Sequence, residues 1–131
     1  PLCEVRLMGY IATTLKVDKY GHAFIELDDD IIESLGTDST AASNMINDFN
    51  NINEVLVWTF ISHDTKTNQY RVNIRSKGPV INEVAARHGG GGHKFASGVR
   101  TTDKSIVDDL IKDLSLTCKE FKEESEKNGS N

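Results

Sequence analysis

The chain has 131 residues, with 15 basic and 20 acidic side chains and a net charge of -5. This length suits one compact domain and excludes two ordinary ones, while the acidic balance, taken alone, argues against a polyanion as partner. Because no apolar stretch approaches the length of a membrane span or signal sequence, and because the chain begins with Pro1, we expect a cytoplasmic piece of a longer polypeptide.

The first half of the chain predicts helices and strands in alternation. Periodicity, turn residues and helix caps predict the end of a connector helix, a hairpin and two short helices, over residues 1–14, 15–17 with 22–27, 28–35 and 37–49. Asp28, Asp29 and Asp30 open the first short helix, and we interpret them as capping residues in preference to metal ligands.

The second half predicts the main part of a sheet. A continuous apolar run over residues 54–62 predicts a central strand, and the alternation of residues 70–75 predicts its hairpin partner. A helix starting at Gly78-Pro79, a strand at residues 97–101 and a final helix follow, with a frayed tail at residues 123–131. We therefore expect an α/β (α+β) fold with a single mixed β-sheet of about five strands flanked by about five helices.

The most distinctive motif is a glycine run, Gly89 to Gly92, followed by His93 and Lys94. Glycine lets the backbone adopt positive φ and lets a ligand approach main-chain N–H groups closely, which suits phosphate. Glycine-rich runs are often flexible linkers, but linkers usually separate domains, and this run joins two predicted elements of one domain. The spacing fits neither a P-loop nor a dinucleotide-binding fingerprint.

The charge distribution also indicates an anion site. Residues 66–102 contain seven basic side chains and a single acidic one. Alternation places Arg71, Asn73 and Arg75 on one face of their strand, and the next helix returns the chain to the glycine run. We interpret Arg71 as a residue that protects the strand face, and Arg75 with the glycines as an anion clamp.

The residues provide a binding site more readily than a catalytic one. His93 could contact a ligand, act as a general acid or stabilise its loop, and we rank ligand contact first. His88 is interpreted as structural. No cluster of Asp and His residues for two metal ions and no nucleophilic triad can be identified in the sequence.

The segments 70–77, 82–85, 89–93 and 96–98 together resemble the C-terminal, DHH-associated domain of DHH-family phosphoesterases, with the bacterial nanoRNase type (bifunctional oligoribonuclease and phosphoadenosine-phosphate phosphatase) as the nearest likeness. The resemblance covers essentially the whole chain, with residues 15–122 as the substrate-binding domain. It implies a two-lobed hydrolase whose N-terminal lobe carries manganese, while the C-terminal lobe holds the phosphate and sugar of a short oligonucleotide or nucleoside phosphate.

The resemblance also implies roles for individual residues. Arg75 and Ser76 match the family's substrate-holding strand end, Gly90, Gly91 and Gly92 its backbone cradle, and His93 the catalytic-site histidine that contacts substrate beside the metal centre. This chain contains no Asp-His-His motif, so we expect it to bind no metal and to be inactive alone. Ser97 stands where many relatives have alanine.

Two other interpretations remain open from the sequence. The chain could be a non-catalytic module that binds single-stranded nucleic acid or tRNA, as the related domain of alanyl-tRNA synthetases suggests, although aromatic stacking residues are sparse. Alternatively, the glycines could serve only a tight turn. The sequence leaves the oligomeric state, including a homo-oligomer, and the choice among oligoribonucleotide, phosphoadenosine phosphate and cyclic dinucleotide open.

Overall fold

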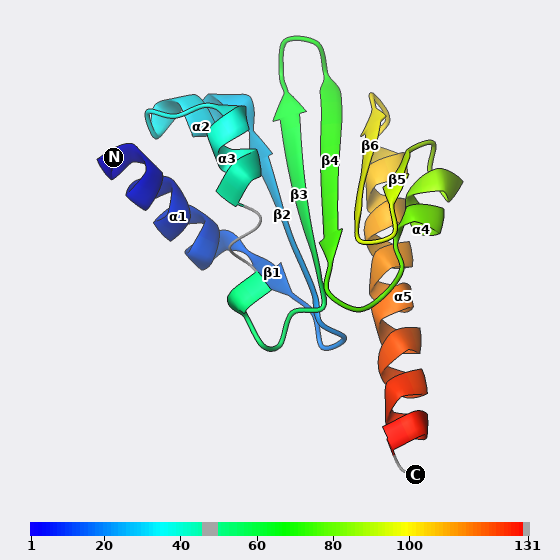
Figure 1. Cartoon of the computed structure of the whole chain (residues 1–131). Helices are drawn as coiled ribbons and strands as arrows, with labels where there is room; N and C mark the ends of the chain where they lie inside the picture. The colour runs from blue at the N-terminus through cyan, green and yellow to red at the C-terminus, as the bar shows by residue number, and fades with distance from the viewer. Residues whose placement is uncertain (46–49, 130–131) are drawn as a thin grey trace.

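The computed structural model describes residues 1–45 and 50–129 (Figure 1). Its six-stranded sheet has the order β1-β2-β3-β4-β6-β5. The strands are β1 (Lys16–Val17), β2 (His22–Asp28), β3 (Val57–Asp64), β4 (Gln69–Ser76), β5 (Gly91–His93) and β6 (Ala96–Thr101). β2 pairs with β3 in parallel and all other neighbours are antiparallel, so the predicted mixed sheet and both predicted hairpins are confirmed.

Helices cover the two faces of the sheet unequally. α1 (Leu2–Thr14), α2 (Asp29–Ser34) and α3 (Ser39–Met45) lie over β2 and β3 on one face, at the left of Figure 1. On the opposite face, α4 (Asn82–Arg87) and α5 (Lys104–Gly129) pack against β3, β4 and β6. On the face where α1, α2 and α3 lie, strands β4, β6 and β5 are therefore not covered by any helix of the described part of the chain.

β3 links two hydrophobic cores because its side chains are buried on both faces, as the continuous apolar run predicted. Trp58 and Phe60 pack with Leu7 and Ile11 of α1 in one core. Val57 and Ile61 pack in the other core with the apolar stripe of α5, whose buried residues are Val107, Leu110, Leu114 and Cys118. Full burial of a side chain such as Phe60 contributes about 2 to 3 kcal/mol.

Some predicted boundaries differ from the structure. The helix predicted from Gly78-Pro79 begins at Asn82, and Val80, which lies before it, is exposed. The final helix continues to Gly129, whereas residues 123–131 were expected to fray. The end of the predicted helix 37–49 lies partly outside the described residues. At its start, Asp38 accepts a hydrogen bond from the Ala41 N–H at 2.9 Å.

The three consecutive aspartates hold the β3–β4 hairpin. Asp28, predicted as a cap, makes no side-chain capping bond and instead lies 3.2 Å from Nδ1 of His63. Asp29 forms an ion pair with Arg71 at 3.6 Å, and Asp30 accepts a hydrogen bond from Thr65. The aspartates thus join the start of α2 to the neighbouring hairpin.

Candidate functional site

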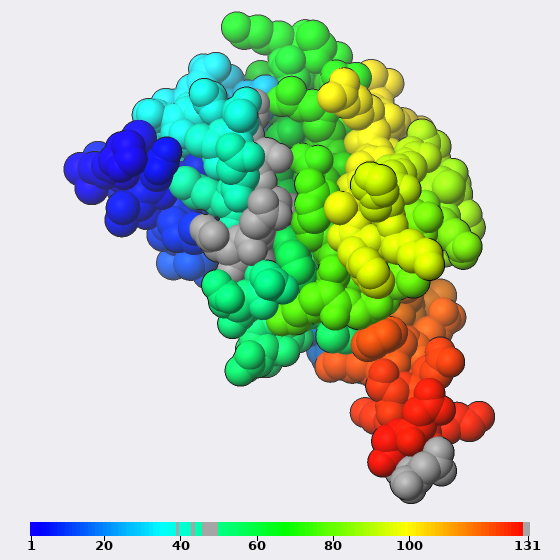
Figure 2. Space-filling model, viewed as in Figure 1, coloured from blue at the N-terminus to red at the C-terminus, as the bar shows by residue number. Residues whose placement is uncertain are grey.

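The uncovered face of β4, β6 and β5 carries Arg75, His93 and other residues predicted from the sequence to bind a ligand, and we call it the open face. Strand register decides which side chains share it, because directly paired residues in a sheet point to the same side. It consists of Arg71, Asn73 and Arg75 of β4, Ala96, Gly98 and Arg100 of β6, and Gly91 and His93 of β5. None of these eight residues is buried. Figure 2 views the molecule from this side, with β5 and β6 in yellow at the surface.

One row across the open face brings together two predicted site residues that are far apart in sequence. Arg75 pairs with Ala96, and Ala96 pairs with His93. The small side chain of Ala96 between them leaves the space above the row free of bulk. His93 is exposed, while the guanidinium of Arg75 donates to the adjacent Ile74 carbonyl at 2.9 Å. The row therefore places an arginine and a histidine on the same face of the sheet.

The four glycines play different parts. Gly89 and Gly92 have φ of +86° and +142°, which other residues rarely adopt. A Cβ on Gly90 would lie 2.1 Å from the Gly98 carbonyl oxygen, and the Gly90 N–H already donates to the Ala85 carbonyl at 2.9 Å. A Cβ on Gly91 would meet no atom within 4 Å. Gly90 is thus needed for packing, whereas Gly91 leaves room above the open face.

β5 is an edge strand, so one row of its main-chain groups has no neighbouring strand. Hydrogen bonds fix the hairpin that joins it to β6. Ser97 donates its hydroxyl to the His93 carbonyl at 2.7 Å, and the Lys94 carbonyl accepts from the Ile81 N–H at 2.8 Å. The Phe95 carbonyl accepts from the Ser76 N–H at 3.0 Å. His93 is therefore presented by a rigid turn.

The other end of the glycine run is anchored through α4. Asp113 of α5 accepts hydrogen bonds from Arg87 and from Nε2 of His88, the latter at 2.9 Å. Burial alone would raise the pKa of Asp113, but these hydrogen bonds outweigh it and the pKa lies below its ordinary value. His88 thus has the structural contact that the sequence indicated.

Ser76 lies apart from the other predicted site residues. It follows Arg75 in β4, so it points to the opposite face, where it is buried. Its hydroxyl donates to the Pro79 carbonyl at 2.5 Å and accepts from the Gly78 N–H at 3.2 Å. Lys77 donates to the carbonyls of Asn50 and Ile52. In this structure Ser76 stabilises the turn after β4, and Lys77 ties that turn to the segment before β3.

Two residues of the open face were not singled out in the sequence as site residues. Asn73 and Arg100 line a cavity of about 490 Å³, which is also lined by Arg71, Val72, Gly89, Gly90, Gly98 and Val99. Alternation placed Asn73 on the same strand face as Arg75, but only the β4–β6 register places Arg100 there. The cavity adjoins the Arg75–His93 row.

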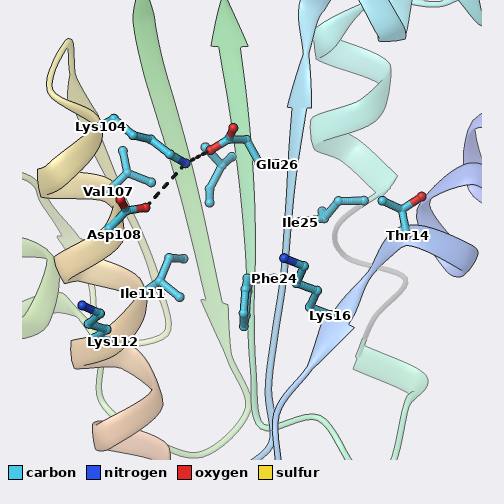
Figure 3. A pocket seen from close by; sticks show the side chains of 11 residues that line it. Thr14, Lys16, Phe24, Ile25, Glu26, Lys104, Val107, Asp108, Ile111 and Lys112 are labelled. Atoms are coloured by element: carbon cyan, nitrogen blue, oxygen red, sulfur yellow. Dashed lines mark hydrogen bonds and ion pairs between the residues drawn. The ribbon is translucent and has the colours of Figure 1, made fainter.

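A second cavity, of about 570 Å³, lies on the opposite face between α5 and strands β1 and β2 (Figure 3). Phe24 and Ile111 line its interior, and Lys104 closes one end through ion pairs with Glu26 and, at 3.6 Å, with Asp108. None of the predicted site residues lines it. The sheet lies between this cavity and the open face.

Within residues 1–45 and 50–129, no three His, Cys, Asp or Glu side chains gather in a way that could hold a metal ion. The potential ligands of the open face are limited to His93 and the amide of Asn73, so its residues do not fit a metal centre of their own. No helix in the described ranges is long and apolar enough to cross a membrane.

The curated relatives are longer proteins. The chain is 35% identical over 116 residues to the bifunctional oligoribonuclease and PAP phosphatase NrnA of Bacillus subtilis, covering 88% of this chain and 36% of that protein. It is 36% identical over 114 residues to the probable bifunctional oligoribonuclease and PAP phosphatase NrnA of Streptococcus mutans, with 87% and 36% covered. The chain thus spans about a third of the length of these phosphoesterases.

Solved structures share the fold. An exopolyphosphatase-related protein from Bacteroides fragilis matches with a TM-score of 0.75 and 24% identity, over 91% of this chain and 37% of that chain. The pGpG-specific phosphodiesterase PggH of Vibrio cholerae matches with a TM-score of 0.66 and 13% identity, over 91% and 40%. The DHHA1 domain family matches residues 18–120. Together with the relatives in sequence, this match shows that the chain belongs to the DHHA1 domain family.

Proposed function

We propose that this chain is the substrate-binding C-terminal lobe of a metal-dependent phosphoesterase that acts on short oligonucleotides or nucleoside phosphates. The single observation that carries the proposal is the row in which Arg75 and His93 share the open face on either side of Ala96. A guanidinium and an imidazole on one uncrowded surface can hold a phosphate from two sides.

The residues present indicate which steps this chain would perform and which it would leave to another lobe. Arg75 would bind the phosphate oxygens, Gly91 would allow the ligand to approach the edge of β5, and His93 would contact the substrate from its rigid turn. Catalysis would require manganese bound by an N-terminal DHH lobe of the same polypeptide, because the open face offers no ligand set for a metal. The chain alone is expected to bind and not to hydrolyse.

The relatives support the same substrate class, since both are named as oligoribonuclease and PAP phosphatase. A module for long single strands is less well supported. Such modules stack successive bases on aromatic side chains, and the open face contains none among its eight residues.

The test compares hydrolysis and binding in the full-length protein with manganese, using a diribonucleotide and phosphoadenosine phosphate. His93→Ala and Arg75→Gln should each lower kcat/KM by about 10²-fold or more, because each removes a contact to the charged phosphate in the transition state. Arg6→Gln, an exposed arginine on α1, is the matched control and should leave kcat/KM unchanged.

Two results would contradict the proposal. If both variants keep the wild-type kcat/KM, Arg75 and His93 do not form part of the substrate-binding site. Vigorous hydrolysis of the diribonucleotide by this 131-residue chain alone, with manganese, would show that it does not depend on a metal-binding lobe elsewhere.

A further inference from the structure

The open face also carries a pair of arginines away from the Arg75–His93 row. Arg71 and Arg100 are directly opposite each other on β4 and β6 and point to the same side. Like charges in this position destabilise a sheet. Both side chains line the 490 Å³ cavity. Two guanidiniums that repel each other at the edge of a cavity favour the binding of an anion between them.

The existing counter-charge is incomplete. Asp29 reaches Arg71 from α2, but its carboxylate lies 3.6 Å from the guanidinium, beyond hydrogen-bonding distance. Arg100 is exposed, and its side chain has no hydrogen bond or ion pair among the described residues. Asp64 also interacts electrostatically with Arg71, so the two carboxylates offset the charge of Arg71. Arg100 therefore supplies the guanidinium that is available to a ligand.

The cavity suits a phosphate bound close to the main chain. Gly89, Gly90 and Gly98 line it without side chains, so an anion held by Arg100 can approach the backbone. The guanidinium fork matches two phosphate oxygens at once. Asn73 lines the same cavity, between the two arginines of its strand.

The Arg71–Arg100 pair lies at a different level along the strands from the Arg75–His93 row. Arg71 and Arg75 lie on one strand, four residues apart, which corresponds to about 13 Å along β4. We propose that Arg100, assisted by Arg71, forms a second anion subsite, which binds a phosphate of a short oligonucleotide other than the one held by Arg75 and His93. This inference rests on the proposed function and adds a preference for oligonucleotides over mononucleotides.

The experiment measures binding without turnover. Full-length protein in a metal chelator is titrated calorimetrically with pA, pApA, pApApA and pApApApA. Wild-type affinity should rise by about tenfold once the oligonucleotide reaches the second subsite, as expected for one charge-assisted contact. Arg100→Gln should abolish this rise while leaving the affinity for pA unchanged. Arg6→Gln, which removes the same charge from α1, should retain the rise.

The salt dependence gives an independent measurement. Loss of one phosphate contact should reduce the slope of log affinity against log salt by about 0.7 for the longest oligonucleotide. A length dependence and salt slope unchanged in Arg100→Gln would overturn the second subsite while leaving the proposed function intact. Failure of the wild-type protein to bind any member of the series would contradict both proposals.

Discussion

Substitution of two adjacent glycines by alanine separates the packing role of the glycine run from its binding role. In Gly90→Ala the new methyl would lie 2.1 Å from the Gly98 carbonyl oxygen and 2.6 Å from a methyl of Val99. Because the first of these atoms belongs to the backbone of β6, no side-chain rotation relieves the contact. Forced overpacking of this kind costs about 1 to 3 kcal/mol, and we expect Gly90→Ala to reach the upper end of this range.

Gly91→Ala should have the opposite profile. Its Cβ would meet no atom within 4 Å and its φ is not positive, so the folded state accepts the methyl. Alanine also reduces the conformational freedom of the unfolded chain, which should raise stability by about 0.4 to 1 kcal/mol. The methyl would stand on the open face beside His93, however, and should keep a phosphate from the edge of β5. Loss of one charge-assisted contact corresponds to about tenfold lower affinity or more.

Urea denaturation gives the free energy of unfolding of both variants, and calorimetric titration with a diribonucleotide in the full-length protein gives their affinities. The reasoning fails if Gly90→Ala unfolds at the wild-type urea concentration, because the contact of the new methyl with the Gly98 carbonyl would then be absent. If Gly91→Ala binds as tightly as the wild type, no ligand approaches β5 at this position. A Gly91→Ala variant that loses stability but keeps its affinity would favour the tight-turn interpretation.

Two further predictions concern groups behind the site. Ser97→Ala removes the hydrogen bond to the His93 carbonyl and should cost about 1 kcal/mol in urea denaturation; an unchanged midpoint would show that the turn does not depend on it. Burial lowers the pKa of His22, which bonds Thr59 and Ser115, to about 4. Because the unfolded chain takes up this proton below about pH 6.5, the free energy of unfolding should fall by about 3 kcal/mol between pH 6.5 and 4. Urea denaturation of His22→Gln should lack this contribution, and parallel pH profiles for the two proteins would contradict it.

The hydrophobic pattern of the sequence predicted those helices and strands in which buried residues recur at regular intervals. The continuous apolar run became the doubly buried β3, and alternation assigned Arg71, Asn73 and Arg75 to one face of β4. The same alternation separates Ser76 from Arg75, because consecutive strand residues point to opposite faces. The resemblance grouped these two residues as a motif, and only the geometry distinguishes the side chain on the open face from the one that closes a turn.

Features set by pairing between distant segments could not be predicted in this way. A run of glycines has little intrinsic tendency to form a strand, and β5 exists because β6 supplies its partners. The start of α4 is similarly determined from a distance, since the Ile81 N–H is used by the Lys94 carbonyl. Arg100 lies on the open face because β6 pairs with β4 in the register that places Arg100 opposite Arg71.

The arrangement of small and basic residues suits the proposed anion-binding surface despite the acidic net charge of the chain. Three positions on the open face are glycine or alanine, namely Gly91, Ala96 and Gly98, and they lie between the cations contributed by the strands. Larger side chains there would fill the space above the sheet and hold a ligand away from both the backbone and the guanidiniums. Because a charge acts most strongly at short range, the net charge of -5 matters less to a bound phosphate than the cations within a few ångströms of it. Replacing Ala96 by a bulkier residue should therefore weaken phosphate binding even though no charge changes.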